Sequence, residues 1–243
     1  MHGKNSKENQ TNQIDYYNKY AAKQKSVGIN LRHKSIAAKL VDSGLRSDAS
    51  VLEIGCGIGT FSSLLSNIIP NGKALCLDIS DESIEFAKKT YNSNSNLNFE
   101  TANAVQYDFK ETKFDTIILP DVIEHIPLEQ HAQLFEKLSQ MLKKEGFIFI
   151  HIPNPYYLEW CHENAPETLQ IIDQPIYTEE LIKNIAPFGL HIFKVETYSI
   201  WRKDCDYQYI ILKKNNFQDF SQIIEEKVTL VDKIKYKLNA KGK

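Results

Sequence analysis

Apolar and polar positions along this chain follow two alternating periods, which predicts strands and helices in succession. Short apolar runs predict seven strands, at 51–54, 73–77, 97–100, 114–119, 147–152, 191–197 and 207–212. Apolar residues at helical spacing predict helices after these strands, over 61–68, 81–91, 127–142 and 178–187. This alternation predicts an α/β fold: a Rossmann-like doubly wound sheet of seven strands that ends in an antiparallel hairpin, with helices on both faces.

The same pattern divides the chain into segments. Residues 1–13 are polar and lack apolar periodicity, which predicts a disordered arm. Residues 14–47 carry a tyrosine cluster and then a helical pattern, and we expect a helical lid segment there. The strand–helix core occupies 48–213, and an aromatic and polar insertion at 153–175 is expected to shape a substrate pocket.

The tail at 214–243 has apolar residues at helical spacing, with lysines among and beyond them. This pattern predicts a helix that docks on the domain or on a second subunit, in which case the protein is a homodimer. A patch that binds a membrane surface or a nucleic acid is the alternative.

Composition narrows the classes of protein further. The chain has 243 residues and a formal net charge of −2, and this charge argues against sequence-independent binding of nucleic acid. Its four cysteines show no C-x-x-C spacing, so we expect buried reduced thiols. No hydrophobic run approaches membrane-spanning length, and we therefore expect no membrane span and a cytoplasmic location.

Three glycines at alternate positions follow the first predicted strand. Gly55, Gly57 and Gly59 would allow a tight turn and the close approach of a ligand to the backbone. The dinucleotide fingerprint G-x-G-x-x-G would need a glycine at position 60, where this chain has Thr60. An acid, Glu53, stands two residues before the first glycine.

This G-x-G-x-G loop resembles motif I of the class I S-adenosylmethionine-dependent methyltransferases, and the resemblance extends over residues 48–152. It implies S-adenosylmethionine as the cofactor. Asp78 ends the second strand, where a carboxylate can accept hydrogen bonds from both ribose hydroxyls. Asn103 stands where these enzymes usually carry an aspartate that reads the adenine edge. The cofactor-binding residues that the resemblance implies are Glu53, Gly55, Cys56, Gly57, Gly59, Asp78, Ile79, Asn103, Ala104 and Leu119.

The segment after the fourth strand, residues 119–126, contains the candidate chemical site. Its Glu-His pair resembles a methyltransferase subgroup that includes ubiquinone-pathway O-methyltransferases and small-RNA terminal ribose methyltransferases. The resemblance implies that Asp121, Glu124 and His125 are catalytic and bind a divalent metal, Mg²⁺ or Mn²⁺. A metal-free role, in which the pair orders the loop or His125 acts as a general base, stays open.

Polar and aromatic residues near this segment are candidates for substrate binding. His151 and Asn154 follow the fifth strand and could donate to a ligand, or could only bond the strand end. The tyrosines could form an aromatic lid or could be ordinary packing. The candidate substrate-binding residues are Tyr16, Tyr17, Tyr20, His151, Asn154 and Tyr157.

Together these features predict an S-adenosylmethionine-dependent methyltransferase that acts on a small polar metabolite. The predicted reaction is O-methylation of a sugar or nucleotide-activated intermediate of surface-glycan biosynthesis. The alternatives are a metal-dependent nucleic-acid ribose methyltransferase and a quinone or lipid O-methyltransferase. An inactive cofactor-binding subunit would be marked by a damaged glycine loop, and this loop is intact.

Overall fold

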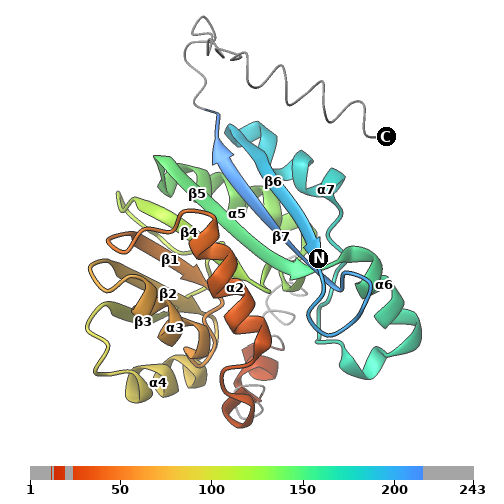
Figure 1. Ribbon diagram of the computed structural model, residues 1–243, viewed down its shortest axis with the longest axis horizontal. Helices are drawn as coiled ribbons and strands as arrows, with labels where there is room; N and C mark the ends of the chain where they lie inside the picture. Colours follow the sequence, from red (N-terminus) through yellow and green to blue (C-terminus); the bar gives the residue numbers. More distant parts are fainter. Residues whose placement is uncertain (1–11, 13, 20–23, 216–243) are drawn as a thin grey trace, which may run out of the picture.

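Seven strands form one sheet in the computed structural model, which describes residues 12, 14–19 and 24–215 (Figure 1). The strands are β1 (Ser50–Ile54), β2 (Lys73–Asp78), β3 (Leu97–Thr101), β4 (Phe114–Pro120), β5 (Leu142–Pro153), β6 (Leu190–Tyr198) and β7 (Tyr207–Lys214). Their order is β3-β2-β1-β4-β5-β7-β6. The first five are parallel, and β7 lies antiparallel between β5 and β6. The predicted sheet with its closing hairpin is confirmed.

Helices cover both faces of this sheet (Figure 1). They are α2 (Leu31–Asp42), α3 (Thr60–Ile68), α4 (Asp81–Thr90), α5 (Leu128–Met141), α6 (Pro155–Asn164) and α7 (Thr178–Ile185). The buried residues of α2, α3 and α4 belong to one hydrophobic cluster, and those of α5 and α7 belong to another. The two clusters lie on opposite faces because side chains alternate along each strand.

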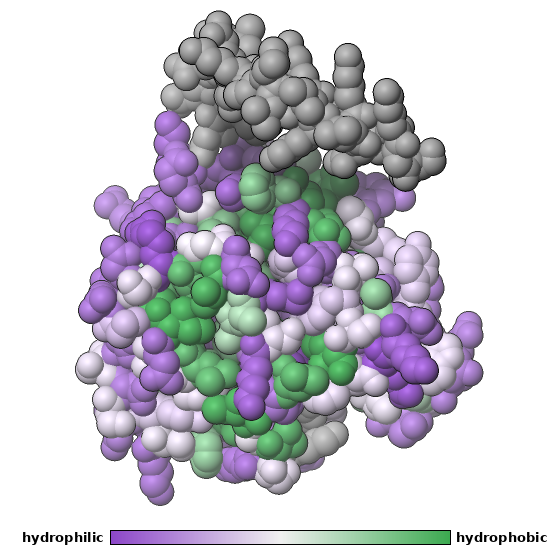
Figure 2. Space-filling model, in the orientation of Figure 1, coloured by the Kyte–Doolittle hydropathy of each residue, from purple (hydrophilic) through white to green (hydrophobic). Residues whose placement is uncertain are grey.

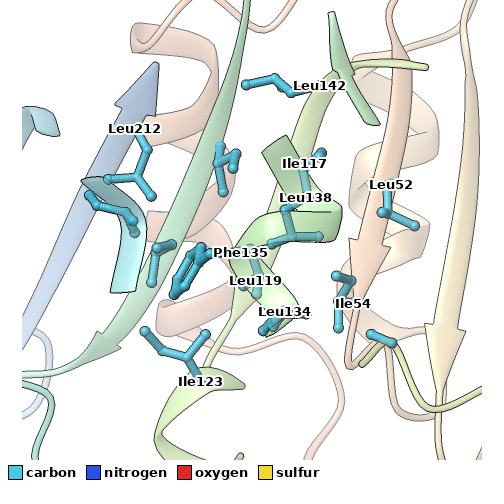
Figure 3. Close-up of a cluster of buried hydrophobic side chains, with 14 of the residues drawn as sticks. Leu52, Ile54, Ile117, Leu119, Ile123, Leu134, Phe135, Leu138, Leu142 and Leu212 are labelled. Atoms are coloured by element: carbon cyan, nitrogen blue, oxygen red, sulfur yellow. The ribbon is translucent and has the colours of Figure 1, made fainter. Parts of the chain in front are cut away.

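The main core lies between α5 and the sheet (Figure 3). Phe135 and Leu138 of α5 are fully buried beside Leu119 of β4. Close packing on this face fixes where β4 ends, and therefore where the loop after β4 begins.

Two local predictions differ from the structure. The helix expected to reach Leu142 ends at Met141, because Leu142 pairs with Phe114 and opens β5. Gly146 therefore lies within β5, where a Cβ would stand 2.6 Å from the Asp115 carbonyl oxygen. The predicted insertion at 153–175 also contains a helix, α6, that the sequence pattern did not predict. Asn154 accepts a hydrogen bond from the Tyr156 amide at 3.1 Å and caps α6, with proline at the first helical position.

The surface in Figure 2 is mixed, with hydrophobic residues set among hydrophilic ones. The described residues contain no helix with the length and apolar character that a membrane crossing requires. Most of the predicted arm at 1–13 and of the predicted tail at 214–243 lies outside the described residues, as does Tyr20.

Candidate functional site

A cavity of about 810 Å³ opens at the carboxyl ends of β1, β2 and β4. The strand order reverses between β1 and β4, and ligands of doubly wound sheets bind at such a point. Residues of the N-terminal segment, among them Tyr17, Gln24 and Arg32, also line the cavity. The cavity therefore lies between the sheet edge and this segment.

The glycine loop forms one wall of the cavity. Gly55, Gly57 and Gly59 have φ values of 75°, 53° and 81°, in the left-handed region that favours glycine. A Cβ at Gly55 would stand 2.3 Å from Val122 Cγ2, in the loop after β4. The absence of a side chain at Gly55 thus lets the glycine loop and the chemical loop pack directly against each other.

Asp78 holds the glycine loop in place. One of its carboxylate oxygens accepts from the Gly57 amide at 2.7 Å, and the other accepts from the Ser80 amide at 2.9 Å. Burial raises the pKa of Asp78, although backbone amides counter the effect. A carboxylate has about four acceptor positions, so two remain for a ligand such as a ribose diol.

Glu53 lies beneath the loop and is fully buried. Ser62 donates to one of its carboxylate oxygens at 2.6 Å, while the other has no hydrogen-bond partner among the described residues. Burial raises the pKa of Glu53 to about 7. A positively charged ligand group nearby would favour its ionised form.

Asn103 is held in a turn at the end of β3. Its side-chain oxygen accepts from the Val105 amide at 2.9 Å, and the residue lines the cavity beside Ala104. A carbonyl oxygen has two lone pairs, so one is still available to an adenine amine.

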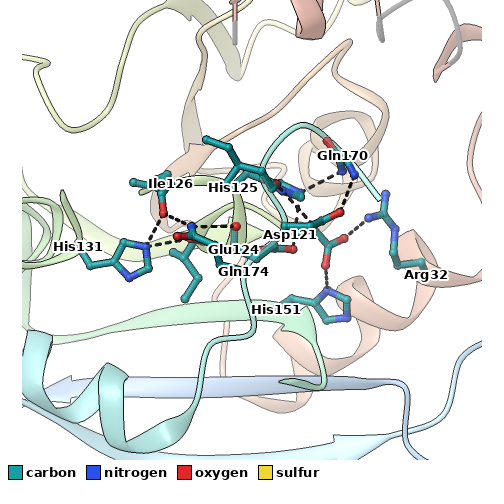
Figure 4. A network of polar contacts seen from close by, with 12 residues as sticks. Arg32, Asp121, Glu124, His125, Ile126, His131, His151, Gln170 and Gln174 are labelled. Carbon is teal, nitrogen blue, oxygen red and sulfur yellow. Dashed lines mark hydrogen bonds and ion pairs between the residues drawn. The ribbon is translucent and has the colours of Figure 1, made fainter. Parts of the chain in front are cut away.

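Asp121 begins the chemical loop in the left-handed backbone region, with φ 56°. Arg32 forms an ion pair with one of its oxygens, and His151 Nδ1 donates to the other at 2.6 Å (Figure 4). Burial alone would raise the pKa of this carboxyl, but Arg32 and His151 outweigh it and lower the pKa to about 2. Asp121 is therefore a charged structural anchor that joins α2, β4 and β5.

We expect Arg32→Ala to lower the free energy of unfolding by about 2 kcal/mol at pH 7, because it leaves a buried carboxylate short of positive charge. In the wild type the folded pKa of Asp121 lies below its ordinary value of about 3.9. Its contribution is therefore complete above that value and is lost as pH falls toward 2. Urea denaturation of the wild type and the variant at pH 7 and near pH 3 checks this expectation. The difference in unfolding free energy between the two proteins should be smaller near pH 3, and an equal difference at both pH values would contradict it.

His125 is fixed at both ring nitrogens. Its Nδ1 donates to the Ile172 carbonyl at 2.6 Å, and its Nε2 accepts from the Gln170 side-chain amide at 3.0 Å. Burial lowers the pKa of His125 despite the nearby Asp173. The ring is consequently a neutral imidazole with its lone pair on Nε2, which is the form a general base needs.

Glu124 differs from every other acid of the site. It is 1% exposed and lines the cavity, and neither of its carboxylate oxygens has a hydrogen-bond partner among the described residues. Its Oε1 lies 3.8 Å from His125 Nε2. Burial, followed by the charge of Asp121, raises the pKa of Glu124 well above its ordinary value.

The structure does not fit the implied divalent metal. Within the described ranges, no group of three or more His, Cys, Asp or Glu side chains is arranged to hold a metal ion. Asp121 is neutralised by Arg32, and both nitrogens of His125 already have partners. A metal would have to displace a guanidinium and turn an imidazole, so we derive no chemistry through it.

The cavity brings most of the predicted residues together. Those that line it are Tyr17, Glu53, Gly55, Cys56, Gly57, Asp78, Ile79, Asn103, Ala104, Asp121, Glu124, His125 and Tyr157.

The other predicted residues within the described chain do not line the cavity. Leu119 is packed in the core, and Gly59 is the N-cap residue of α3. His151 is fully buried, because its two nitrogens bond Asp121 and the Tyr198 hydroxyl. Asn154 caps α6 and donates to the Cys205 carbonyl at 2.9 Å. Tyr16 packs edge-on against Tyr17, with 5.3 Å between the centres of the two rings.

Three residues of the site were not predicted. Arg32, Gln170 and Asp173 line the cavity and contact Asp121 or His125. Each comes from a segment far from its partner in sequence, so no spacing pattern marks it. The one available signal was that Arg32 is a basic residue within the predicted lid segment at 14–47.

Comparison with known proteins agrees with this geometry. Residues 51–146 match the family described as "Methyltransferase domain". Malonyl-acyl-carrier-protein O-methyltransferase 1 of Ilyobacter polytropus is 30% identical over 69% of this chain and 58% of its own length. The tRNA N(3)-methylcytidine methyltransferase trm141 of Schizosaccharomyces pombe is 25% identical over 69% of this chain and 67% of its own.

A solved structure shares the fold. The magnesium protoporphyrin IX methyltransferase of Synechocystis, with bound S-adenosylhomocysteine, has a TM-score of 0.60 and 19% identity over 75% of this chain and 81% of its own. Residues 51–146 thus resemble methyltransferase domains, and the chain shares the fold of this solved structure. The chain spans 58% and 67% of the two curated relatives, and their names carry different acceptors.

Proposed function

We propose that this protein transfers a methyl group from S-adenosylmethionine to a hydroxyl of a small polar metabolite, such as a sugar or a nucleotide-activated sugar of surface-glycan synthesis. One observation carries the proposal: a single cavity joins the glycine loop and Asp78 to a polar end formed by Glu124 and His125. The first part suits the cofactor, and the second suits a polar acceptor.

The residues of the chain would divide the work as follows. When bound, S-adenosylmethionine supplies an activated methyl group. The glycine loop and Asp78 would orient it, and the N-terminal segment around Tyr17 would cover the cavity and exclude water. His125 Nε2 would accept the proton of the hydroxyl, after the Gln170 amide gives way to the acceptor. Because the methyl donor is already activated, positioning carries much of the rate.

The charge of the cavity favours a sugar over a nucleic acid. Among the described residues that line it, Arg32 is the one lysine or arginine, and it is paired with Asp121. Phosphates would be repelled inside. Arg202 follows Trp201, a half-exposed lining residue, and its guanidinium lies 5.5 Å from the centre of the Trp160 ring, so it would contact the phosphates of an activated sugar at the rim of the cavity.

Methylation of a panel of acceptors tests the proposal. Purified protein with methyl-labelled S-adenosylmethionine should methylate a sugar or nucleotide sugar on oxygen, with the position located by mass spectrometry. Little dependence on salt is expected. Turnover on RNA that weakens steeply with salt, or turnover on quinones alone, would overturn it.

A further inference from the structure

The Glu124 carboxylate is an isolated group in a cavity whose other acids are satisfied in whole or part. Asp121 has Arg32 and His151, and Asp78 has two backbone amides. Glu124 is 1% exposed, and no described residue donates to either of its oxygens. A buried carboxylate without hydrogen-bond donors destabilises the folded state by about 1–3 kcal/mol for each unmade bond. Glu124 therefore does not contribute to the stability of the fold. Its side chain belongs to the lining of the cavity.

A second unpartnered acceptor lies at the same place. The side-chain oxygen of Gln170 has no hydrogen-bond partner among the described residues, while its nitrogen is 3.0 Å from His125 Nε2. Glu124 Oε1 is 3.8 Å from that same nitrogen. Figure 4 shows Glu124, His125 and Gln170 next to one another. The site therefore contains hydrogen-bond acceptors on Glu124 and Gln170 that a ligand with N–H or O–H groups could use.

The charged groups around Glu124 also favour a cationic ligand. Asp173 adds a second carboxylate beside His125, 3.2 Å from Nδ1. Burial lowers the pKa of His33 to about 4 and also lowers that of His125, so both imidazoles are neutral. Arg32 is already engaged with Asp121. An anion here would be repelled, whereas a cation would favour the ionised form of Glu124, whose pKa burial otherwise raises.

The cofactor and a metal are poor candidates for this position. The cofactor's sulfonium has no N–H group, so it cannot donate to Glu124, and the ammonium of its methionine portion would lie at the glycine loop, above Glu53 and its unpartnered oxygen. A metal ion would find too few ligands among the described residues. An ammonium group has three donors in a compact cation and suits two neighbouring oxygen acceptors.

We propose that the methyl acceptor is an amino alcohol, such as an amino sugar, whose ammonium group binds Glu124 and the side-chain oxygen of Gln170. This rests on the proposed function and names its substrate class. The ammonium anchors the molecule and has no lone pair with which to attack, so the methyl group goes to a hydroxyl that faces His125 Nε2. The 3.8 Å between Glu124 Oε1 and that nitrogen suits amino and hydroxyl groups on adjacent carbons.

Calorimetry with matched probes tests this assignment. Protein saturated with S-adenosylhomocysteine should bind glucosamine, a vicinal amino alcohol, at least about tenfold more tightly than glucose. Glu124→Gln should remove that preference and leave the affinity for S-adenosylhomocysteine unchanged. Glu163→Gln, which changes an exposed acid of α6, is the matched control and should behave as wild type. Thermal melting of Glu124→Gln should occur at or above the wild-type temperature, which excludes misfolding.

Other outcomes overturn the assignment. Equal binding of the two sugars, no binding of either at millimolar concentration, or a preference that survives Glu124→Gln would each do so. Mg²⁺ binding that Glu124→Gln abolishes would assign the carboxylate to a metal instead. If methylation of neutral hydroxyl substrates proceeds while amines show no advantage, the amine assignment fails and the proposed function stands. If S-adenosylhomocysteine does not bind at all, the proposed function fails first.

Discussion

Asp78→Ala should lower the affinity for S-adenosylmethionine by at least about 100-fold. Two ribose hydroxyls would lose a charged acceptor, and each such hydrogen bond contributes about 1.5–3 kcal/mol. The Gly57 amide, which donates to Asp78 at 2.7 Å, would also lose its partner, so the glycine loop would be held less firmly. Titration calorimetry of the variant with S-adenosylmethionine measures the effect.

Two companion variants separate recognition from folding. Asp78→Asn keeps the size of the side chain and one acceptor oxygen, so its affinity should fall between those of the wild type and Asp78→Ala. Glu82→Gln changes an exposed acid in the first turn of α4 and should bind as wild type does. Wild-type affinity in Asp78→Ala would show that the ribose lies elsewhere.

His125→Ala should reduce kcat by about 100-fold, the lower end of the range for loss of a general base. The neutral ring, with its lone pair on Nε2, is the reactive form, and burial lowers its pKa below the ordinary value of about 6.5. Wild-type kcat should therefore stay level through neutral pH and fall only in acid, as the ring gains a proton. That acidic limb should be absent in the variant. Steady-state kinetics from pH 5 to pH 9 (roughly the range where histidine titrates) checks both points.

His125→Gln distinguishes chemistry from position. Glutamine can still donate to the Ile172 carbonyl but has no nitrogen that titrates in this range. Restored kcat in His125→Gln would mean that the ring only orders the loop. Full activity in His125→Ala would dismiss the general-base role.

Local signals in the sequence predicted the fold and the residues that form the glycine-loop end of the cavity. The three glycines lie within one loop, and Asp78 and the Ser80 cap stand two residues apart at the end of β2. The structural role of each of these residues can therefore be predicted from its spacing in the sequence alone. The boundary at Leu142 was missed because an apolar residue suits both the end of a helix and the start of a strand, and only the pairing with Phe114 decides between them.

The acceptor end depends on contacts between distant segments. Arg32 lies 89 residues from Asp121, and Gln170 lies 45 residues from His125. Without these partners, Asp121, Glu124 and His125 resemble three equivalent ligands. The structure separates them into an anchored acid, an unpartnered acid and a neutral base. His151 was predicted to bind a substrate. In the structure it is hydrogen-bonded to Asp121 and to the Tyr198 hydroxyl, and it therefore holds Asp121 in position.

Titration calorimetry of the wild-type protein with S-adenosylmethionine, S-adenosylhomocysteine and NAD tests the central claim most directly. The geometry of the glycine loop and Asp78 predicts that both adenosyl ligands bind, each at one site per chain, and that NAD does not. Tight binding of NAD without binding of either adenosyl ligand would contradict the account.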